Sequence, residues 1–188
     1  MSKLFLSQEQ IGRMLDLAKD NPRNCCLFHL QLSTGLRIGD TLRLKRKQLI
    51  DSDSLVVRSI RLKMGKTGQW VARKLREDCR AVVASYLKTR SDDNPYLFPS
   101  LSNNSRARRG PMSRVAAHGV YKRYLSLLFP KSILSGASTH TMRRSVAKMI
   151  SVKAGRIEPA TTFLGHASVS STMSYIDMGD QERRADEI

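Results

Sequence analysis

Apolar residues recur at helical spacing along most of the chain, and capping residues mark several helix ends. Ser7 and Gln10 have the spacing of a capping box, and apolar residues then repeat every three or four positions from Ile11 to Ala18. Residues 25–34 predict a second helix that ends in a left-handed conformation at Gly35. Residues 36–49 predict a sharp turn into a third helix, whose exposed end carries Arg43, Lys45, Arg46 and Lys47.

Further along the chain, the pattern changes once to that of a β-hairpin. Residues 54–62 and 69–75 predict two short strands, joined by the glycine-bearing turn Met-Gly-Lys-Thr-Gly at 64–68. Then come a long polar loop at 91–111 and five helices, at 77–90, 112–129 (capped by Ser113), 139–155, 158–164 and 168–176. The pattern predicts a mainly α fold with a small antiparallel β-sheet (α+β). We expect a single domain over residues 1–188, with a core at 7–176 and a charged tail at 177–188.

The distribution of charge along the chain indicates what kind of partner the protein binds. The 188 residues carry a formal net charge of +17. No Asp or Glu occurs from Asn94 to Arg156, whereas twelve Lys or Arg residues lie between Arg106 and Arg156. Net charge that served solubility alone would not separate the two signs in this way. The segregation favours a polyanion lying against the second half of the chain, which indicates nucleic-acid binding.

The cysteines and the apolar segments exclude other classes of protein. Cys25, Cys26 and Cys79 are odd in number and two of them are adjacent, so they predict neither a disulfide framework nor a zinc site. No stretch approaches the ~20 apolar residues of a membrane span, and the N-terminus lacks a secretory pattern. We therefore expect a cytoplasmic protein with no membrane partner, whose cysteines are small core residues.

The segment 139–155 brings a histidine and an arginine to the start of a helix. Its apolar stripe of Met142, Val146, Met149 and Ile150 predicts the buried face. His140 and Arg143 are three apart, hence neighbours on an adjacent face, at a helix N-terminus that favours an anion. Arg144 points away from the stripe, toward solvent or a phosphate. The alternative is that Thr139 caps the helix and that the histidine and the arginine are incidental.

Two further basic residues lie in unusual settings. Arg37 stands between Leu36 and Ile38 after a helix-ending glycine, which predicts a partly buried guanidinium that needs a partner, with Asp40 the nearest candidate. A structural ion pair that only pins the turn is the alternative, although five donors allow both roles. Lys66, between two glycines at the hairpin tip, matters only if the site needs a positioned ammonium.

Residues 163–177 combine one imidazole, His166, with one phenol, Tyr175, in a run of small and hydroxylated residues. On its own, Tyr175 is either a half-buried anchor of a short helix or a nucleophile. The other four tyrosines lie in apolar or proline-bounded settings that favour structural roles: Tyr86, Tyr96, Tyr121 and Tyr124.

Taken in order, these motifs resemble the catalytic domain of the tyrosine recombinases, the phage integrase and Xer family, which is mechanistically related to type IB topoisomerases. The matching motifs are R-x-x-D after T-G-L, K-T-G in a hairpin, H-x-x-R, L-G-H and a tyrosine nine positions later, and the resemblance covers about residues 7–176. It implies a site of Arg37, Lys66, His140, Arg143, His166 and Tyr175.

The resemblance also implies a role for each residue. The two arginines and the histidine of the family motif activate the scissile phosphate, Tyr175 attacks it, and Lys66 is the general acid. Asp40 matches the acidic residue that supports the first arginine. The charge pattern also gives candidates for DNA binding. They are Arg43, Lys45, Arg46, Lys47, Lys63, Arg106, Arg108, Arg109 and Arg144.

The chemistry of these residue types agrees with such a role. Guanidinium groups can stabilise the charge that develops on phosphate oxygens. A phenol with a pKa of about 10 needs a base such as His140, or the field of the arginines, to lose its proton at neutral pH. The chain has no carboxylate cluster for Mg²⁺, so we expect strand cutting and rejoining through a 3′-phosphotyrosine without metal, cofactor or ATP.

Two other functions are weighed against the recombinase: a non-catalytic basic DNA-binding protein that keeps the fold, and a metal-independent RNA cleaver that uses His140 and Lys66. The resemblance implies double-stranded DNA as partner, a dimer or tetramer on DNA, exchange of the tail between subunits, and a bacterial, phage or plasmid origin. The helical DNA clamp that usually precedes this domain has no counterpart before residue 7, so we expect a compact member or a catalytic fragment. Arg144 stands where many members have histidine.

Overall fold

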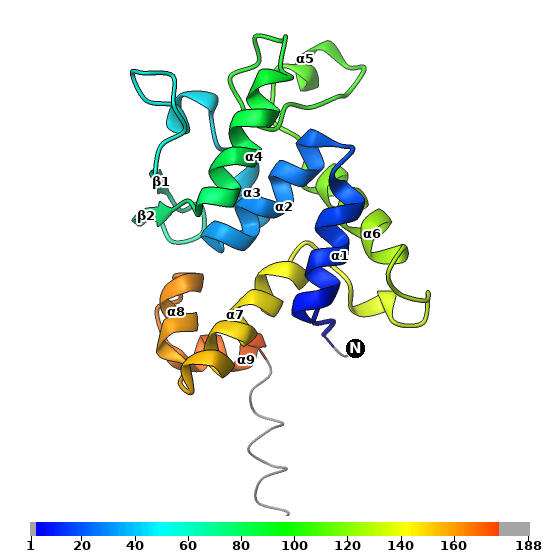
Figure 1. Ribbon diagram of the computed structural model, residues 1–188, viewed down its shortest axis with the longest axis vertical. Helices are drawn as coiled ribbons and strands as arrows, with labels where there is room; N and C mark the ends of the chain where they lie inside the picture. The colour runs from blue at the N-terminus through cyan, green and yellow to red at the C-terminus, as the bar shows by residue number, and fades with distance from the viewer. Residues whose placement is uncertain (1–2, 177–188) are drawn as a thin grey trace, which may run out of the picture.

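The computed structural model describes residues 3–176, and the predicted tail at 177–188 lies outside the described residues. Figure 1 shows helices throughout the chain and one hairpin at the edge of the molecule. The helices are α1 Gln8–Ala18, α2 Pro22–Thr34, α3 Ile38–Leu42, α4 Glu77–Lys88, α5 Ser105–Arg108, α6 Arg114–Ser126, α7 Thr141–Ala154, α8 Glu158–Leu164 and α9 Val169–Ile176, with short 3₁₀ turns η1 Arg46–Gln48 and η2 Leu134–Gly136. The strands β1 Ser59–Lys63 and β2 Trp70–Lys74 pair antiparallel, which confirms the predicted mainly α fold with a small antiparallel sheet.

The predicted helix ends are confirmed where a local signal set them. Ser7 and Gln10 form the capping box of α1, and the Ser113 side chain accepts a hydrogen bond at the start of α6. Gly35 ends α2 with a φ of 61°, and Gly155 ends α7 with a φ of 64°. Both glycines adopt a left-handed conformation that costs other residues conformational energy.

The predicted third helix is wrong beyond Leu42. The backbone at 44–46 pairs with residues 95–97 instead: Leu97 donates to the Leu44 carbonyl at 2.8 Å, and Arg46 donates to the Pro95 carbonyl at 2.9 Å. These long-range hydrogen bonds hold the basic stretch out of a helix, and only the turn η1 follows. Nothing in the local pattern signals a partner 50 positions away.

Two other boundaries differ from the prediction. The first strand begins at Ser59 rather than at residue 54, because residues 50–56 form a small bridge of their own between Ile50 and Val56. The polar loop at 91–111 contains the short helix α5.

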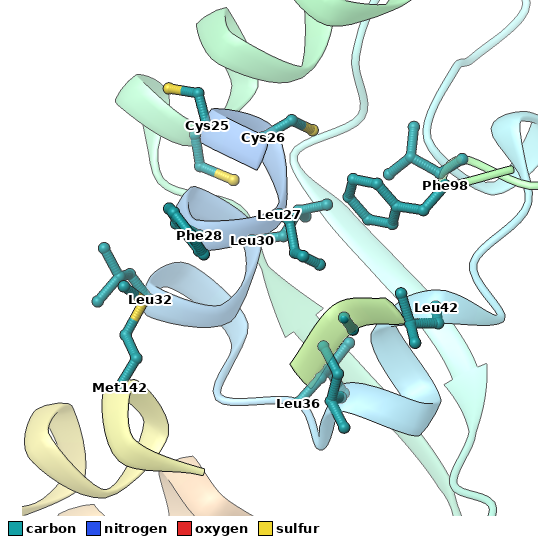
Figure 2. Close-up of a cluster of buried hydrophobic side chains, with 14 of the residues drawn as sticks. Cys25, Cys26, Leu27, Phe28, Leu30, Leu32, Leu36, Leu42, Phe98 and Met142 are labelled. Carbon is teal, nitrogen blue, oxygen red and sulfur yellow. The ribbon is translucent and has the colours of Figure 1, made fainter. Parts of the chain in front are cut away.

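The main core is built around α2, which packs against α1, α4 and α7. Phe28 of α2 meets the edges of the Tyr121 and Tyr124 rings at centroid distances of 5.0 and 5.1 Å. Figure 2 shows Met142 of α7 reaching the same cluster beside Leu32. A second, smaller cluster of Ala147, Ala160, Leu164 and Ile176 joins α7, α8 and α9. The C-terminal helices are thereby attached to the core through α7.

The buried face of α7 differs from the predicted stripe. Met142 is fully buried, but Val146, Met149 and Ile150 are only partly buried. The other side of the helix is enclosed because α7 packs between α2 and the pair α8 and α9, and it carries Arg143, Ala147 and Ser151, all buried. A charged side chain of the expected site therefore lies inside the fold.

Candidate active site

The six residues expected at the site line one cleft of about 400 Å³. Arg37 comes from the start of α3, Lys66 from the hairpin tip, and His140 and Arg143 from the start of α7. His166 follows α8, and Tyr175 lies in the last turn of α9. Residues up to 138 positions apart thus meet in one place.

Tyr175 lies in the middle of this group. Its hydroxyl is 3.1 Å from Nδ1 of His140, and the two rings meet edge to face. The His166 ring meets it at right angles with a centroid distance of 5.2 Å, and the Arg143 guanidinium lies 5.8 Å from the ring centroid. Burial raises the pKa of the Tyr175 phenol, and the charge of Arg143 opposes that rise. The phenol therefore needs a base in order to lose its proton near neutral pH.

His140 is suited to be that base. Part of the residue is exposed, but its ring packs against Tyr175, and this burial lowers the pKa of the imidazole. The charges of Arg143 and Arg144 lower it further. An imidazole whose pKa lies below its usual range is neutral at pH 7 and can accept a proton.

Arg143 is 1% exposed and is held by backbone carbonyls at two ends of helices. It donates one hydrogen bond to the Gly35 carbonyl after α2 and another, at 2.6 Å, to the Leu164 carbonyl at the end of α8. Burial lowers its pKa to about 10, and the Tyr175 phenol opposes that effect. Its Nε group is buried and has no hydrogen-bond partner among the described residues.

Arg37 is half-buried, and its Nη1 group also has no hydrogen-bond partner in the described part of the chain. The expected pairing with Asp40 is wrong: the Asp40 carboxylate binds Arg43 at 2.5 Å and accepts from the Gly65 N–H at 2.9 Å. Asp40 sits in the first turn of α3, and its carboxylate is bound by Arg43 and by the Gly65 N–H of the hairpin. It therefore ties α3 to the turn that carries Lys66. Arg37 lines the cleft, although its unpartnered Nη1 atom is itself buried.

His166 follows Gly165, which adopts a left-handed φ of 62° and ends α8. Its Nδ1 atom is 3.1 Å from the hydroxyl of Thr172, a fully buried residue of α9. Burial lowers the pKa of His166 to about 4, together with the charges of Arg143, Arg37 and Lys66. The imidazole is neutral at pH 7, so its hydrogen-bonding pattern depends on which nitrogen holds the single proton.

Arg73 and Thr172 were not among the residues expected here. Arg73 of β2 donates to the Thr162 carbonyl at 3.4 Å, and a Cβ atom on Gly165 would lie 2.6 Å from its Nη2. The strand pattern contained a signal for it, because Arg73 alternates onto the inner face of the hairpin, opposite the buried Ile60. The closeness of Thr172 to His166 depends on how α9 folds back, which no local pattern shows.

The residues expected to bind DNA divide into two groups. Three are engaged by the protein itself: Arg43 with Asp40, Arg46 with the Asp92 carbonyl at 2.7 Å, and Arg144 with the Gly136 carbonyl at 3.3 Å and over the Phe5 ring. The others are exposed: Lys45, Lys47, Lys63, Arg106, Arg108 and Arg109. Figure 1 places α5, which contains Arg106 and Arg108, at the opposite end of the molecule from α8 and α9. Contact of these residues with DNA stays a prediction.

Comparison with known proteins agrees with this geometry. A model of the phage integrase family matches residues 4–182. The chain belongs to the phage integrase family. Two curated relatives of this chain are the tyrosine recombinase XerA of Pyrococcus horikoshii, 26% identical over 171 residues, and the probable integrase/recombinase YoeC of Bacillus subtilis, 27% identical over 169 residues. Both alignments cover 90% of the chain, but they cover 55% of XerA and 85% of YoeC. The chain thus spans about half the length of the XerA relatives.

Two solved recombinase structures have the same fold as this chain. The crystal structure of XerA recombinase superposes with a TM-score of 0.75 at 23% identity, over 98% of this chain and 64% of that one. XerH recombinase bound to its difH substrate gives a TM-score of 0.70 at 20% identity, over 97% and 52% of the two chains. The family resemblance of the sequence and the fold of a recombinase catalytic domain are therefore confirmed. None of the helices between residues 3 and 176 is long and apolar enough to span a bilayer.

Proposed function

We propose that the protein is a site-specific DNA recombinase that cuts and rejoins strands through a covalent 3′-phosphotyrosine. The observation that supports this most directly is the 3.1 Å contact between the Tyr175 hydroxyl and Nδ1 of His140, in a cleft lined by Arg37, Arg143 and Lys66. A nucleophile in contact with a neutral base is the arrangement that covalent catalysis requires.

The first step is attack of the Tyr175 oxygen on the scissile phosphorus. The phenolic proton passes to Nδ1 of His140, which is neutral because burial and neighbouring arginines lower its pKa. The bond from phosphorus to the tyrosine oxygen forms as the bond to the 5′-oxygen breaks. Lys66 donates a proton to the departing 5′-oxygen, and attack by a new 5′-hydroxyl reverses the steps. Because the phosphotyrosine retains an ester bond, rejoining needs no ATP.

Negative charge that develops on the phosphate oxygens is stabilised by the guanidiniums. Arg37 lines the same cleft, which puts its guanidinium charge beside the phosphate. Arg143 is fixed by two carbonyls, so its charge is held beside Tyr175 at little cost in reorganisation. His166, oriented by Thr172, donates a hydrogen bond to a phosphate oxygen. This division of roles needs no metal ion.

The substrate is double-stranded DNA, and the protein works as a dimer or tetramer on it. Net charge of +17 and the acid-free stretch from Asn94 to Arg156 support a polyanionic partner. XerH in complex with difH and a λ integrase dimer on a core site show that structures of this fold are known with DNA bound.

A suicide-substrate experiment tests the function even though the target sequence is not specified. The protein is incubated in EDTA with a pool of nicked duplexes that carry a randomised core, and denaturation-resistant adducts are isolated and sequenced. Wild type should form an adduct whose DNA is attached to the peptide that contains Tyr175. Tyr175→Phe should form none but still bind DNA, whereas Tyr96→Phe should form it normally.

An adduct that persists in Tyr175→Phe would contradict the assignment of the nucleophile. Wild-type protein that binds the pool yet never forms an adduct would instead support the non-catalytic DNA-binding alternative.

A further inference from the structure

The outer face of the β-hairpin is strongly basic and carries the only tryptophan of the chain. In the antiparallel pairing, Lys63 lies opposite Trp70, Arg61 opposite Ala72, and Ser59 opposite Lys74. Paired residues point to the same side of a sheet, and these six residues are all exposed. We call them the hairpin outer face. The other side, with Ile60 and Leu62, packs on the core.

No acidic residue balances this charge within the hairpin. The stretch 54–76 contains seven Lys or Arg and no Asp or Glu. Within the described residues, Arg61, Lys63 and Lys74 form no ion pair. An exposed two-stranded sheet usually mixes charges of both signs, so a surface of one sign, solvated and unpaired, is suited to a polyanion.

Trp70 adds an exposed aromatic ring to the cations of the hairpin outer face. It is 67% exposed, next to Lys63 across the sheet. Single exposed apolar residues are common, but an indole beside unpaired cations can contact DNA in two ways, with the charges on the phosphates and the ring against a sugar or base edge. The indole N–H also provides a hydrogen-bond donor.

The turn of the same hairpin reaches the catalytic cleft. Lys66, at the tip between the strands, lines the cleft together with Arg37 and Tyr175. Figure 1 shows β1 and β2 at the edge of the molecule, on the same side as α8. Alternate residues of a strand are about 6.7 Å apart, which corresponds to about two nucleotides of axial rise along one DNA strand. Arg61 and Lys63 are therefore spaced to meet phosphates along one strand.

We propose that the hairpin outer face binds the DNA duplex beside the scissile phosphate, with Arg61, Lys63 and Lys74 on backbone phosphates and Trp70 packed on a sugar or base edge. The proposal rests on DNA being the substrate of the cleft, but it does not require Tyr175 to react. The hairpin outer face would then be a DNA-binding surface outside the cleft.

Because Trp70 is the only tryptophan, its fluorescence reports on this face alone. The full chain is titrated with a 30-base-pair duplex, and anisotropy of the labelled DNA follows binding in parallel. Trp70 emission should change in step with binding. Trp70→Ala should weaken binding about fivefold, because the apolar contact of the indole with a sugar or base edge is lost. Leu101→Ala, which also truncates an exposed apolar side chain, should bind as wild type does.

The salt dependence tests the cations. Arg61→Gln, Lys63→Gln and Lys74→Gln should each lower the slope of log K against log salt by about 0.9, the contribution of one phosphate contact. Lys88→Gln, at the exposed end of α4, should leave it unchanged. Binding without a change in Trp70 emission, or with unchanged slopes in the three variants, would overturn the proposal. These results are independent of adduct formation, whereas wild type that binds no DNA would remove the proposed function as well.

Discussion

At the scale of single residues, the two histidines of the cleft differ in what holds them. His140 is in contact with the reacting hydroxyl, whereas His166 is oriented from behind by Thr172, 3.1 Å from its Nδ1. A neutral imidazole has one N–H. If the Thr172 hydroxyl donates to Nδ1, the proton lies on Nε2, which can then donate to a phosphate oxygen. The Thr172 hydroxyl has one proton and also lies 3.5 Å from the Ser168 carbonyl, so we predict that it donates to Nδ1 of His166 and thereby keeps the histidine proton on Nε2.

This reasoning predicts the effect of Thr172→Val. The substitution keeps the shape of a fully buried side chain but removes its hydroxyl. Adduct formation should slow about fivefold to tenfold, because one hydrogen bond contributes about 1 kcal/mol. Thr161→Val, which removes a hydroxyl that donates to the Ile157 carbonyl at the start of α8, is the matched control. Equal rates for the two variants, measured on the selected suicide duplex, would exclude the role of Thr172.

At the scale of elements, the C-terminal end of α8 connects the hairpin with α7. Its last carbonyls accept from Arg73 of the hairpin and Arg143 of α7, at Thr162 and Leu164. Cations at a helix C-terminus are favoured by the helix dipole. The two contacts fix the turn that carries His166 relative to both the hairpin and α7.

Gly165 is where this junction is most sensitive, and Gly155 provides its control. Both have a left-handed φ, 62° and 64°, so Ala at either position costs roughly 1–2 kcal/mol of unfolding free energy. A Cβ atom at Gly155 would meet nothing within 4 Å, whereas at Gly165 it would meet Arg73 at 2.6 Å. Gly165→Ala should therefore lose more stability in urea than Gly155→Ala and should also slow adduct formation. Identical losses would show that the Arg73 contact does not matter.

At the scale of the whole molecule, the sequence predicted what local signals determine. The capping box at Ser7 and the turn at Gly35 need only their neighbours, and both are confirmed. The motif order also identified the residues that meet in the cleft. The third helix failed because Leu44 pairs with Leu97, a contact between distant segments. Asp40 was assigned to the wrong arginine because its carboxylate binds Arg43, three positions further along the chain, and the Gly65 N–H of the hairpin.

The burial of His166 beside the arginines of the cleft predicts how the stability of the protein depends on pH. Burial and the charges of Arg143 and Arg37 lower the pKa of His166 to about 4, below its ordinary value of 6.5. The unfolded chain therefore takes up this proton at higher pH than the folded chain, so the free energy of unfolding falls as pH falls from about 6.5 toward 4. Neutral His166 adds no such dependence above pH 7.

His166→Gln removes this ionisation and should flatten the loss of Tm between pH 7 and pH 5 relative to wild type. His118→Gln replaces an exposed histidine of α6 and should keep the wild-type profile. Thermal denaturation at several pH values, at constant ionic strength, compares the three proteins. If His166→Gln lost stability as steeply as wild type, proton uptake by His166 would not be what destabilises the fold, and the arginines would not hold its imidazole neutral. If Tm depended less on pH in His166→Gln but not in His118→Gln, the environment of His166 that is suited to a phosphate would also determine the pH dependence of stability in the protein without DNA.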